Sequence, residues 1–468
     1  MVEGSSIAAV VASIRGDAAR SQPGDRLPST RQLVKRLGVS PVTVSHALAL
    51  LAAEGEVDTR PGAGTFAAVP RRSPPPERAR DHAWQSIPLG NHLVDDSGMR
   101  SLVQEPAPDA IALASGYPHP SLTPVRHLAA ALARAGRRPG AWERPALSGL
   151  DPLRRWFADS IGSDIGAGDV LVTSGGQAAL SVALRATSPA GSPVLVESPT
   201  YPGVLAIAGA AGLVATPVPV DDGGVRIDLL EEAFARTGAR LLYCQPTFQN
   251  PTGSVMDAQR RADLLAVVRA AGAFVIEDDW ARWLTHDGAA PPPMISDDGE
   301  GRVLHVRSLT KTAAPGLRIG ALVARGPVAE RLRALRLVDA LFVNGPLQET
   351  ALDLVTSASW SRHVASLNGA LRLRKQALIA ALGTHCPGVR LGLEPGGGFY
   401  VWGQLPPGLD DVEVAAAASA AGVTVAAGRP FFAAEPAGAF LRFSYAGPAS
   451  IGDIDVGLRR LAGVLGAG

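Results

Sequence analysis

Apolar residues in the first fifty positions recur at intervals of three and four, the spacing of one face of a helix. The first group, residues 7–14, predicts a helix that Ser5 or Ser6 can cap. Two shorter helices are expected next, over residues 30–37 and from Ser40 onward, because glycine suits the end of the first and serine followed by proline suits the start of the second. Two short helices joined by such a turn form a helix-turn-helix.

Residues 57–66 then predict two short strands around a glycine-rich tip, the wing of a winged helix. Over residues 7–66 the chain resembles the winged-helix domain of the GntR family, including Leu-Pro-Ser-Thr-Arg at 27–31. The resemblance implies that six residues face DNA: Arg31, Ser40, Thr43, Ser45, Arg60 and Gly62. Short hydroxyl side chains at the start of a recognition helix can reach base edges, and arginine neutralises phosphate. In the alternative interpretation Ser40 only caps a helix and the others are surface groups.

From about Asp109 the pattern changes to short apolar runs that alternate with helical stretches. This alternation predicts an α/β fold with a mostly parallel sheet and helices on both faces. The expected strands are residues 170–172, 194–197, 241–245, 274–277, 303–306 and 321–324. Open sheets of this kind bind ligands beyond the ends of their strands, where the polar motifs of this chain occur.

Between the two patterns, residues 69–81 are rich in proline and arginine and have no apolar period. Such a segment is extended and semi-rigid, at about 3 Å per residue. We therefore expect a winged-helix domain over residues 1–69, a linker over 70–95, and a large domain over 96–468 whose smaller C-terminal α+β subdomain begins near 365. A solubilising tether is the favoured role of the linker, and contact between its arginines and DNA is the alternative.

Composition narrows the class of protein. With 46% hydrophobic and 19% charged residues in 468, the chain is globular and long enough for more than one domain. Two cysteines are too few for a disulfide framework, and no cluster of cysteine and histidine has the spacing of a metal site. Residues 1–6 lack the features of a secretory signal, and glycines and prolines divide the uncharged run 201–220 into a buried helix and a strand. We expect a cytoplasmic protein with no metal and no membrane partner.

Lys311 lies in a segment with the composition of a lysine Schiff-base site. A lysine amine can hold an aldehyde cofactor covalently, while nearby hydroxyls and Arg318 can bind a phosphate. A glycine-rich turn at 174–177 leads into a helix whose free N–H groups and positive end suit an anion. Each motif alone has an ordinary structural explanation, but their joint occurrence in order predicts a site for pyridoxal 5′-phosphate.

Over residues 110–465 the chain resembles the fold-type I pyridoxal-phosphate enzymes, specifically aspartate-aminotransferase-like proteins. The resemblance implies a phosphate site at Gly175, Gly176, Gln177, Ser308 and Arg318, ring contacts from Tyr201, Asn250 and Asp278, an aldimine on Lys311, and a substrate carboxylate on Arg442. Trp280, also expected at the cofactor, stands where relatives carry a tyrosine, and an indole N–H can donate a hydrogen bond but cannot ionise near neutral pH. Arg144 replaces a tyrosine that often reaches the partner subunit's phosphate.

A homodimer is also implied by this resemblance. Residues 1–66 carry seven Lys and Arg against six Asp and Glu, a net charge of +1. Because non-specific affinity for DNA comes largely from neutralised phosphates, one such module should bind weakly, and two copies on a dimer would be needed.

A GntR-like winged helix joined to an aminotransferase-like domain is the architecture of the MocR-type regulators. It implies a transcription regulator that binds double-stranded DNA and responds to pyridoxal phosphate, or to an amine or amino acid that reacts with the Lys311 aldimine. The alternative is an active aminotransferase with an accessory DNA-binding module, since the residues needed for transamination are intact. A cofactor-free regulator is disfavoured because the lysine and the ring partners are all present.

Overall fold

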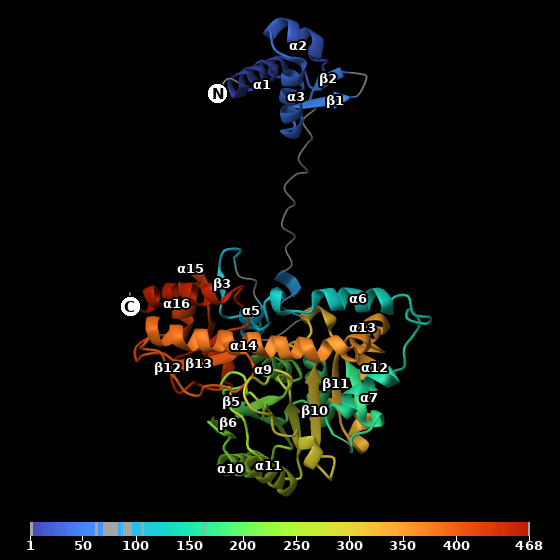
Figure 1. Cartoon of the computed structure of the whole chain (residues 1–468), viewed down its shortest axis with the longest axis vertical. Coiled ribbons are helices and arrows are strands. Elements are labelled where there is room, and N and C mark those ends of the chain that lie inside the picture. The colour runs from blue at the N-terminus through green and yellow to red at the C-terminus, as the bar shows by residue number, and fades with distance from the viewer. Residues whose placement is uncertain are drawn as a thin grey trace. The chain divides into compact units, whose positions relative to one another are not determined.

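The computed structural model describes residues 3–60, 64–68, 83–85, 87, 96–103, 107–162 and 164–466. The chain divides into two compact units, Met1–His92 and Leu93–Gly468, which Figure 1 shows with their elements labelled. None of the described helices is long and apolar enough to cross a membrane.

The first unit is a winged helix. Its elements are α1 (Glu3–Arg20), α2 (Thr30–Leu37), α3 (Pro41–Ala53), β1 (Val57–Arg60) and β2 (Gly64–Ala67). The predicted helix boundaries of the helix-turn-helix are confirmed, because Ser29 caps α2, Gly38 ends it with a φ of 65°, and Ser40 caps α3. The prediction that Ser5 or Ser6 caps α1 is wrong, since the apolar stripe marks the buried part of that helix and not its first turn.

The second unit is built on an eight-stranded sheet with the order β4-β11-β10-β9-β8-β5-β6-β7. The strands are β4 (Val170–Thr173), β5 (Pro193–Ser198), β6 (Val214–Asp221), β7 (Gly224–Val225), β8 (Leu241–Cys244), β9 (Phe274–Asp278), β10 (Val303–Ser308) and β11 (Gly320–Val323). The five central strands from β10 to β6 are parallel, so the prediction of a mostly parallel sheet is confirmed. Strand β11 is antiparallel to both neighbours, because the short connection from β10 cannot cross the sheet.

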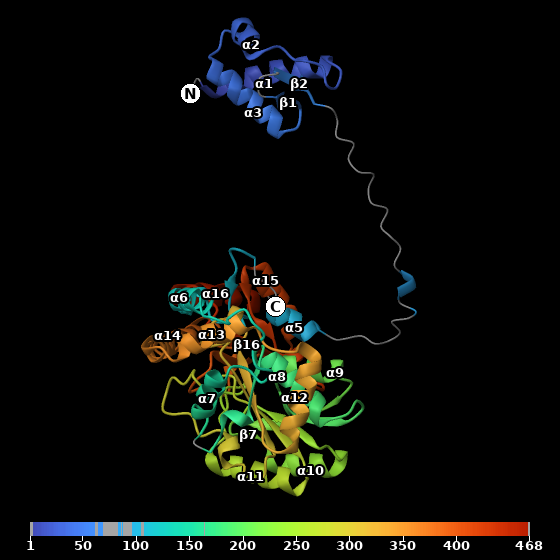
Figure 2. The same ribbon diagram turned by 90° about the vertical axis from the view of Figure 1, so that its right-hand side faces the viewer.

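Helices cover both faces of this sheet. Successive strand residues point to opposite faces, so Leu171 and Val172 of β4 belong to different hydrophobic cores. One face packs against α7 (Asp151–Asp159), α10 (Ile227–Thr237), α11 (Ala258–Ala270) and α13 (Gly345–Val355). The other face packs against α8 (Gly176–Thr187), α9 (Pro202–Ala210) and α12 (Pro327–Ala340), and in Figure 2 the sheet lies between α7 and α9.

The smaller C-terminal subdomain contains an antiparallel sheet of order β12-β13-β16-β15. Its strands are β12 (Arg390–Leu391), β13 (Tyr400–Gln404), β15 (Ala426–Ala427) and β16 (Phe440–Ser444), with helices α14 (Ala358–His385), α15 (Asp411–Ala420) and α16 (Ile451–Leu465). Helix α14 packs on both α16 and α13, and Figure 1 shows it running between them. Its length therefore ties the small subdomain to the large sheet.

The segment that enters the second unit lies against the small subdomain. Strand β3 (Ile111–Ala112) pairs in parallel with β14 (Val423–Thr424). Before it comes α5 (Ser97–Val103), which packs on α9 and on η6 (Arg429–Phe431), and after it comes α6 (Val125–Ala135), which packs on α13. The remaining short 3-10 turns are η1 (Ala83–Gln85), η2 (Pro120–Leu122), η3 (Ala167–Asp169), η4 (Met294–Asp297) and η5 (Pro315–Leu317).

Candidate functional site

A cavity of about 290 Å³ opens beyond the ends of the parallel strands. The residues predicted from the sequence that line it are Gly176, Gln177, Tyr201, Asn250, Asp278, Trp280, Ser308, Lys311, Arg318 and Arg442. Gly175 lies directly before this set, as the N-cap of α8. The structure thus brings together residues that lie far apart in the sequence.

Lys311 lies in the connection between β10 and β11. Its Nζ donates to the Gly116 carbonyl at 2.6 Å and stands 3.8 Å from the centroid of the Tyr117 ring. Burial, together with the positive charges of Arg442 and Arg318, lowers the pKa of Lys311 to about 7 against the opposing effect of Asp278. An amine with such a pKa is largely unprotonated just above neutrality and is therefore a competent nucleophile.

A candidate anion site lies beside this lysine, where the chain turns from β4 into α8. Gly175 has a φ of 92°, and a Cβ there would come within 2.9 Å of the Arg318 Nη2, so only glycine fits. Arg318 donates to the Ser174 carbonyl at 2.9 Å. The first turn of α8 contributes free backbone N–H groups and the positive end of the helix. The Ser308 hydroxyl is a further donor that lines this part of the cavity.

Asp278 ends β9, the strand next to β10 in the sheet. Its Oδ2 accepts hydrogen bonds from the Tyr243 hydroxyl at 2.7 Å and from Gln245 Nε2 at 2.9 Å. Burial raises the pKa of Asp278 to about 6 although both hydrogen bonds oppose that shift. Sequence reasoning missed Tyr243 and Gln245, which could have been found because β8 ends beside β9 in a parallel sheet.

Asn250 and Tyr201 are held by neighbours within the cavity. The Asn250 backbone N–H donates to Gln245 Oε1 at 3.0 Å, and its side-chain Oδ1 accepts from Arg442 Nη1 at 3.2 Å. The Tyr201 hydroxyl donates to Gln177 Oε1 at 3.1 Å, and burial raises the pKa of Tyr201. Both side chains are thus oriented by the protein itself.

Arg442 is a buried guanidinium on β16, with 1% of its surface exposed. Its Nη2 donates to the Ala114 carbonyl at 2.8 Å, and its carbon Cζ lies 3.9 Å from the centroid of the Tyr400 ring. Burial lowers the pKa of Arg442, and its Nε finds no hydrogen-bond partner among the described residues. A buried cation with a free donor is suited to bind a carboxylate from a ligand.

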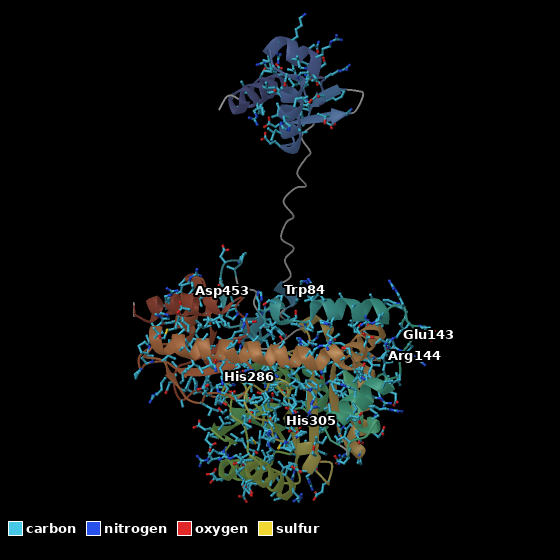
Figure 3. The ribbon with its side chains drawn as sticks, viewed as in Figure 1. Trp84, Glu143, Arg144, His286, His305 and Asp453 are labelled. Atoms are coloured by element: carbon cyan, nitrogen blue, oxygen red, sulfur yellow. The ribbon has the colours of Figure 1, made fainter. Side chains whose placement is uncertain are left out.

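Trp280 borders the cavity, but its indole N–H donates to the Phe248 carbonyl at 3.1 Å. The ring packs edge to face on Phe399. The N–H that the sequence suggested for tuning a cofactor is therefore used by the protein backbone. Arg144 is exposed on the segment between α6 and α7, where Figure 3 shows it beside Glu143, and it is not among the described residues that line the cavity.

The predicted DNA contacts of the first unit have mixed surroundings. The Ser40 Oγ accepts from the Thr43 N–H at 3.2 Å and lies 2.8 Å from the Thr43 hydroxyl, so both side chains take part in capping α3. Arg60 pairs with Asp58 at 3.1 Å and stacks 4.6 Å from the Phe66 ring centroid. Arg31 and Ser45 are exposed, and Gly62 lies outside the described residues.

Two further residues lie on the exposed face of α3: Val42, whose apolar side chain predicted little direct base readout from the sequence, and His46, which sequence reasoning did not include. Val42 is 71% exposed, and His46 lies one turn further along. Val44 and Leu48 lie on the buried face of α3. The helical period of that face places Val42 on the opposite, exposed side, so the sequence pattern could have identified its position. With Ser45 it forms a surface able to meet base edges in a groove.

Comparison with known proteins agrees with this architecture. Residues 108–461 match the family of class I and II aminotransferases, and residues 8–67 match the bacterial regulatory proteins of the gntR family. The HTH-type transcriptional regulator TauR of Rhodobacter capsulatus is 31% identical over 95% of this chain and 93% of its own. The probable rhizopine catabolism regulatory protein MocR of Rhizobium meliloti is 27% identical over 88% of this chain and 84% of its own.

Among solved structures, the α-aminoadipate aminotransferase LysN of Thermus thermophilus, in complex with N-(5′-phosphopyridoxyl)-L-leucine, has the same fold as the second unit. It matches with a TM-score of 0.76 and 31% identity over 82% of this chain and 98% of LysN. The resemblances to a GntR winged helix and to an aminotransferase fold are both confirmed, over nearly the whole chain. The protein therefore belongs to the GntR family, as a MocR-type transcriptional regulator with a class I and II aminotransferase domain.

Proposed function

We propose that this regulator binds pyridoxal 5′-phosphate in the cavity beside Lys311 and responds to that cofactor, or to an amine or amino acid that reacts with it. One observation carries the proposal: a half-buried lysine with a lowered pKa lies in one cavity with a candidate anion site and a buried arginine that has a free donor. The cofactor, when bound, supplies an aldehyde for the lysine amine and a ring that withdraws electrons.

The residues present fit that group. The first turn of α8, Arg318 and Ser308 would hold the phosphate, and the cradle at Gly175 is one that any Cβ would fill. Asp278 would pair with the ring nitrogen, and a cation there would remove the cost of its buried charge. Asn250 would donate to the ring's phenolate oxygen, and Tyr201 would pack on the ring.

Arg442 would bind the carboxylate of an amino acid. It comes from β16 of the small subdomain, whereas Lys311 comes from the β10–β11 connection of the large sheet. A ligand held by both residues favours the conformation in which these two parts approach. It changes regulation only to the extent that it binds this conformation more tightly than the other.

A homodimer is part of the proposal. Large apolar side chains are exposed on α6, on the segment after it and at the end of α12: Leu132, Trp142, Leu147, Val338, Leu341 and Phe342. The Ala141 carbonyl would lie 3.0 Å from a Cβ at Gly345, which places that segment against the start of α13. A soluble protein seldom leaves such a patch open, and a second copy would cover it.

Light scattering with a pair of variants tests the dimer. Val338→Asp should convert dimer to monomer at micromolar concentration, because each copy would place a carboxylate in the covered patch. Val456→Asp, a change at an exposed valine on α16 away from the patch, should leave the dimer intact. An unchanged dimer in Val338→Asp would contradict this choice of face.

The cofactor and the regulatory response are tested together on the purified full chain. Borohydride reduction and peptide mapping should recover a phosphopyridoxyl group on Lys311, and DNA footprinting should show two protected half-sites whose occupancy changes with the cofactor or with added amino acids.

Two buried free cysteines fit the reducing cytoplasm, where we expect the protein to act.

An active aminotransferase is the second candidate, because the lowered pKa of Lys311 and the free donor of Arg442 also suit transamination. Steady multiple turnover at about 1 per second or faster, with no DNA sequence bound selectively, would favour it.

A further inference from the structure

Helix α5 lies between the cavity and a much larger groove of about 1390 Å³. Met99 and Val103 of this helix, together with Tyr117, line both spaces. Beyond them the groove is lined mainly by small apolar side chains, including Ala112, Ala206, Ala415, Ala416 and Ala426. A ligand in the cavity can therefore extend past Met99 and Val103 along an apolar wall.

The charged residues that line both spaces are few. The described lining of the cavity contains three cations, Lys311, Arg318 and Arg442, and one carboxylate, Asp278. In the proposed function Lys311 and Arg318 are used by the cofactor, as is Asp278, which leaves Arg442 for one carboxylate of the ligand. No second carboxylate or second ammonium of a ligand has an opposite partner there among the described residues.

Among the described residues, the groove offers no free charge either. Arg429 is the one ionised side chain among its described lining residues. It pairs with Asp410 at 2.5 Å and with Asp411 at 3.7 Å, so its charge is already neutralised. A charged ligand side chain entering this space would lose its hydration without gaining a partner.

We infer that the effector is an amino acid with a single carboxylate and an uncharged apolar side chain, which contacts Met99 and Val103 and points toward the groove. This inference rests on the proposed function and names the ligand class of the same site. Burial of each additional methylene should tighten binding about threefold to fourfold, until the side chain passes α5.

The test uses the full chain freed of cofactor and a series of N-(5′-phosphopyridoxyl)-L-amino acids, measured by calorimetry. All probes share one phosphate, one ring and one α-carboxylate, so differences in affinity report the side chain. Affinity should rise from the alanine adduct through norvaline to norleucine, and the norleucine adduct should bind about tenfold or more tightly than those of glutamate and lysine. A flat series, or tighter binding of the glutamate adduct, would overturn the inference. Failure of every adduct and of pyridoxal phosphate to bind would instead contradict the proposed function.

Variants at one position place the contact on α5. Met99→Arg should reverse the preference, so that the glutamate adduct binds at least as tightly as the norleucine adduct. Met99→Leu should keep the original order, because it preserves an apolar side chain of similar size. A native circular dichroism spectrum and a cooperative thermal transition in both variants would show that each is folded. An unchanged ratio in Met99→Arg, with that control satisfied, would show that the side chain does not meet α5.

Discussion

The two units of this protein differ in whether their charged side chains are paired. In the cavity of the second unit, Lys311 is half-buried and Arg442 is buried, and both donate to backbone carbonyls, with no carboxylate paired to them among the described residues. On the winged helix, many charges are exposed but satisfied: Arg15 pairs with Glu54 at 2.5 Å and Glu56 at 2.8 Å, and Arg36 pairs with Asp17. Uncompensated buried cations indicate a small anionic ligand, whereas paired surface charges contribute little to any partner.

This contrast fits the different roles proposed for the two units, which are ligand binding for the second and DNA binding for the first. In the proposed function the cavity would hold a phosphate and a carboxylate tightly, because its donors are already oriented and dehydrated. The winged helix has few unpaired cations to neutralise phosphates, so a single copy has little general affinity for DNA. In the proposed dimer, two copies would act together to bind selectively, and a ligand of the second unit would exert its control there.

The largest effect is expected at Lys311, where one variant tests directly whether the unpaired cations of the cavity bind the cofactor. Lys311→Ala should remove all borohydride-stable phosphopyridoxyl label, because the other lysines of the chain lie elsewhere, at positions 35 and 375. Peptide mapping by mass spectrometry measures the label. Lys35→Ala, on the winged helix, should keep it in full. Recovery of the same label from Lys311→Ala would contradict the assignment of the site.

A smaller loss is expected at Arg442. A carboxylate bound to a guanidinium contributes about tenfold to a hundredfold in affinity, so Arg442→Ala should weaken an amino-acid effector by that factor. Basal binding to DNA should remain, and pyridoxal phosphate should still be fixed, because Arg442 acts on the cofactor site only indirectly, through its hydrogen bond to Asn250 and its charge near Lys311. Arg429→Ala, which removes an ion-paired arginine of the groove, is the matched control. A response to effector unchanged in Arg442→Ala would indicate the cofactor itself, or an amine without a carboxylate, as the signal.

The pKa of Lys311 gives the third prediction. Only the unprotonated amine reacts with an aldehyde, and the folded-state pKa of about 7 means that this form increases up to about pH 7 and is nearly complete by about pH 8. The rate at which added pyridoxal phosphate becomes fixed should therefore rise about tenfold per pH unit below about 7 and level off above about 8. A borohydride quench at timed intervals measures it. A rate that continues to rise to about pH 10 would show an ordinary lysine.

The sequence predicted the cavity well because its polar residues follow strands of one sheet, whose ends meet in space. It missed Met99, Val103 and Tyr400, which line the same cavity from α5 and β13. Uncharged side chains on distant segments carry no local chemical signature, so only the folded chain shows that they line the cavity. The same limit applies to Trp280, whose indole N–H reaches a carbonyl 32 residues earlier in the chain.

For the winged helix the sequence predicted the elements and the caps of α2 and α3 but not which charges are free. The net charge of +1 for residues 1–66 does not show which charges pair with each other. Arg15, for example, pairs with Glu54 and Glu56, which lie 39 and 41 positions further along the chain. Arg60, which was predicted to face DNA, pairs with Asp58 in the same strand, and its contact with DNA stays a prediction. Arg31 makes no ion pair with the described residues and is the stronger candidate for a phosphate contact.

The smallest effects are expected on the DNA surface, and they separate two kinds of contact. Arg31→Ala should weaken binding to all sequences and reduce the slope of log affinity against log salt by about one for each half-site, because it removes one phosphate contact per copy. Val42→Ala should leave that slope unchanged and alter preference among sequences by severalfold, since a 71% exposed valine on the face of α3 can meet a thymine methyl group. Salt-dependent fluorescence anisotropy on matched and mismatched half-sites measures both quantities. If Val42→Ala changes the salt slope while Arg31→Ala changes only sequence preference, the roles given to the two residues are reversed, and α3 does not present this face to the bases.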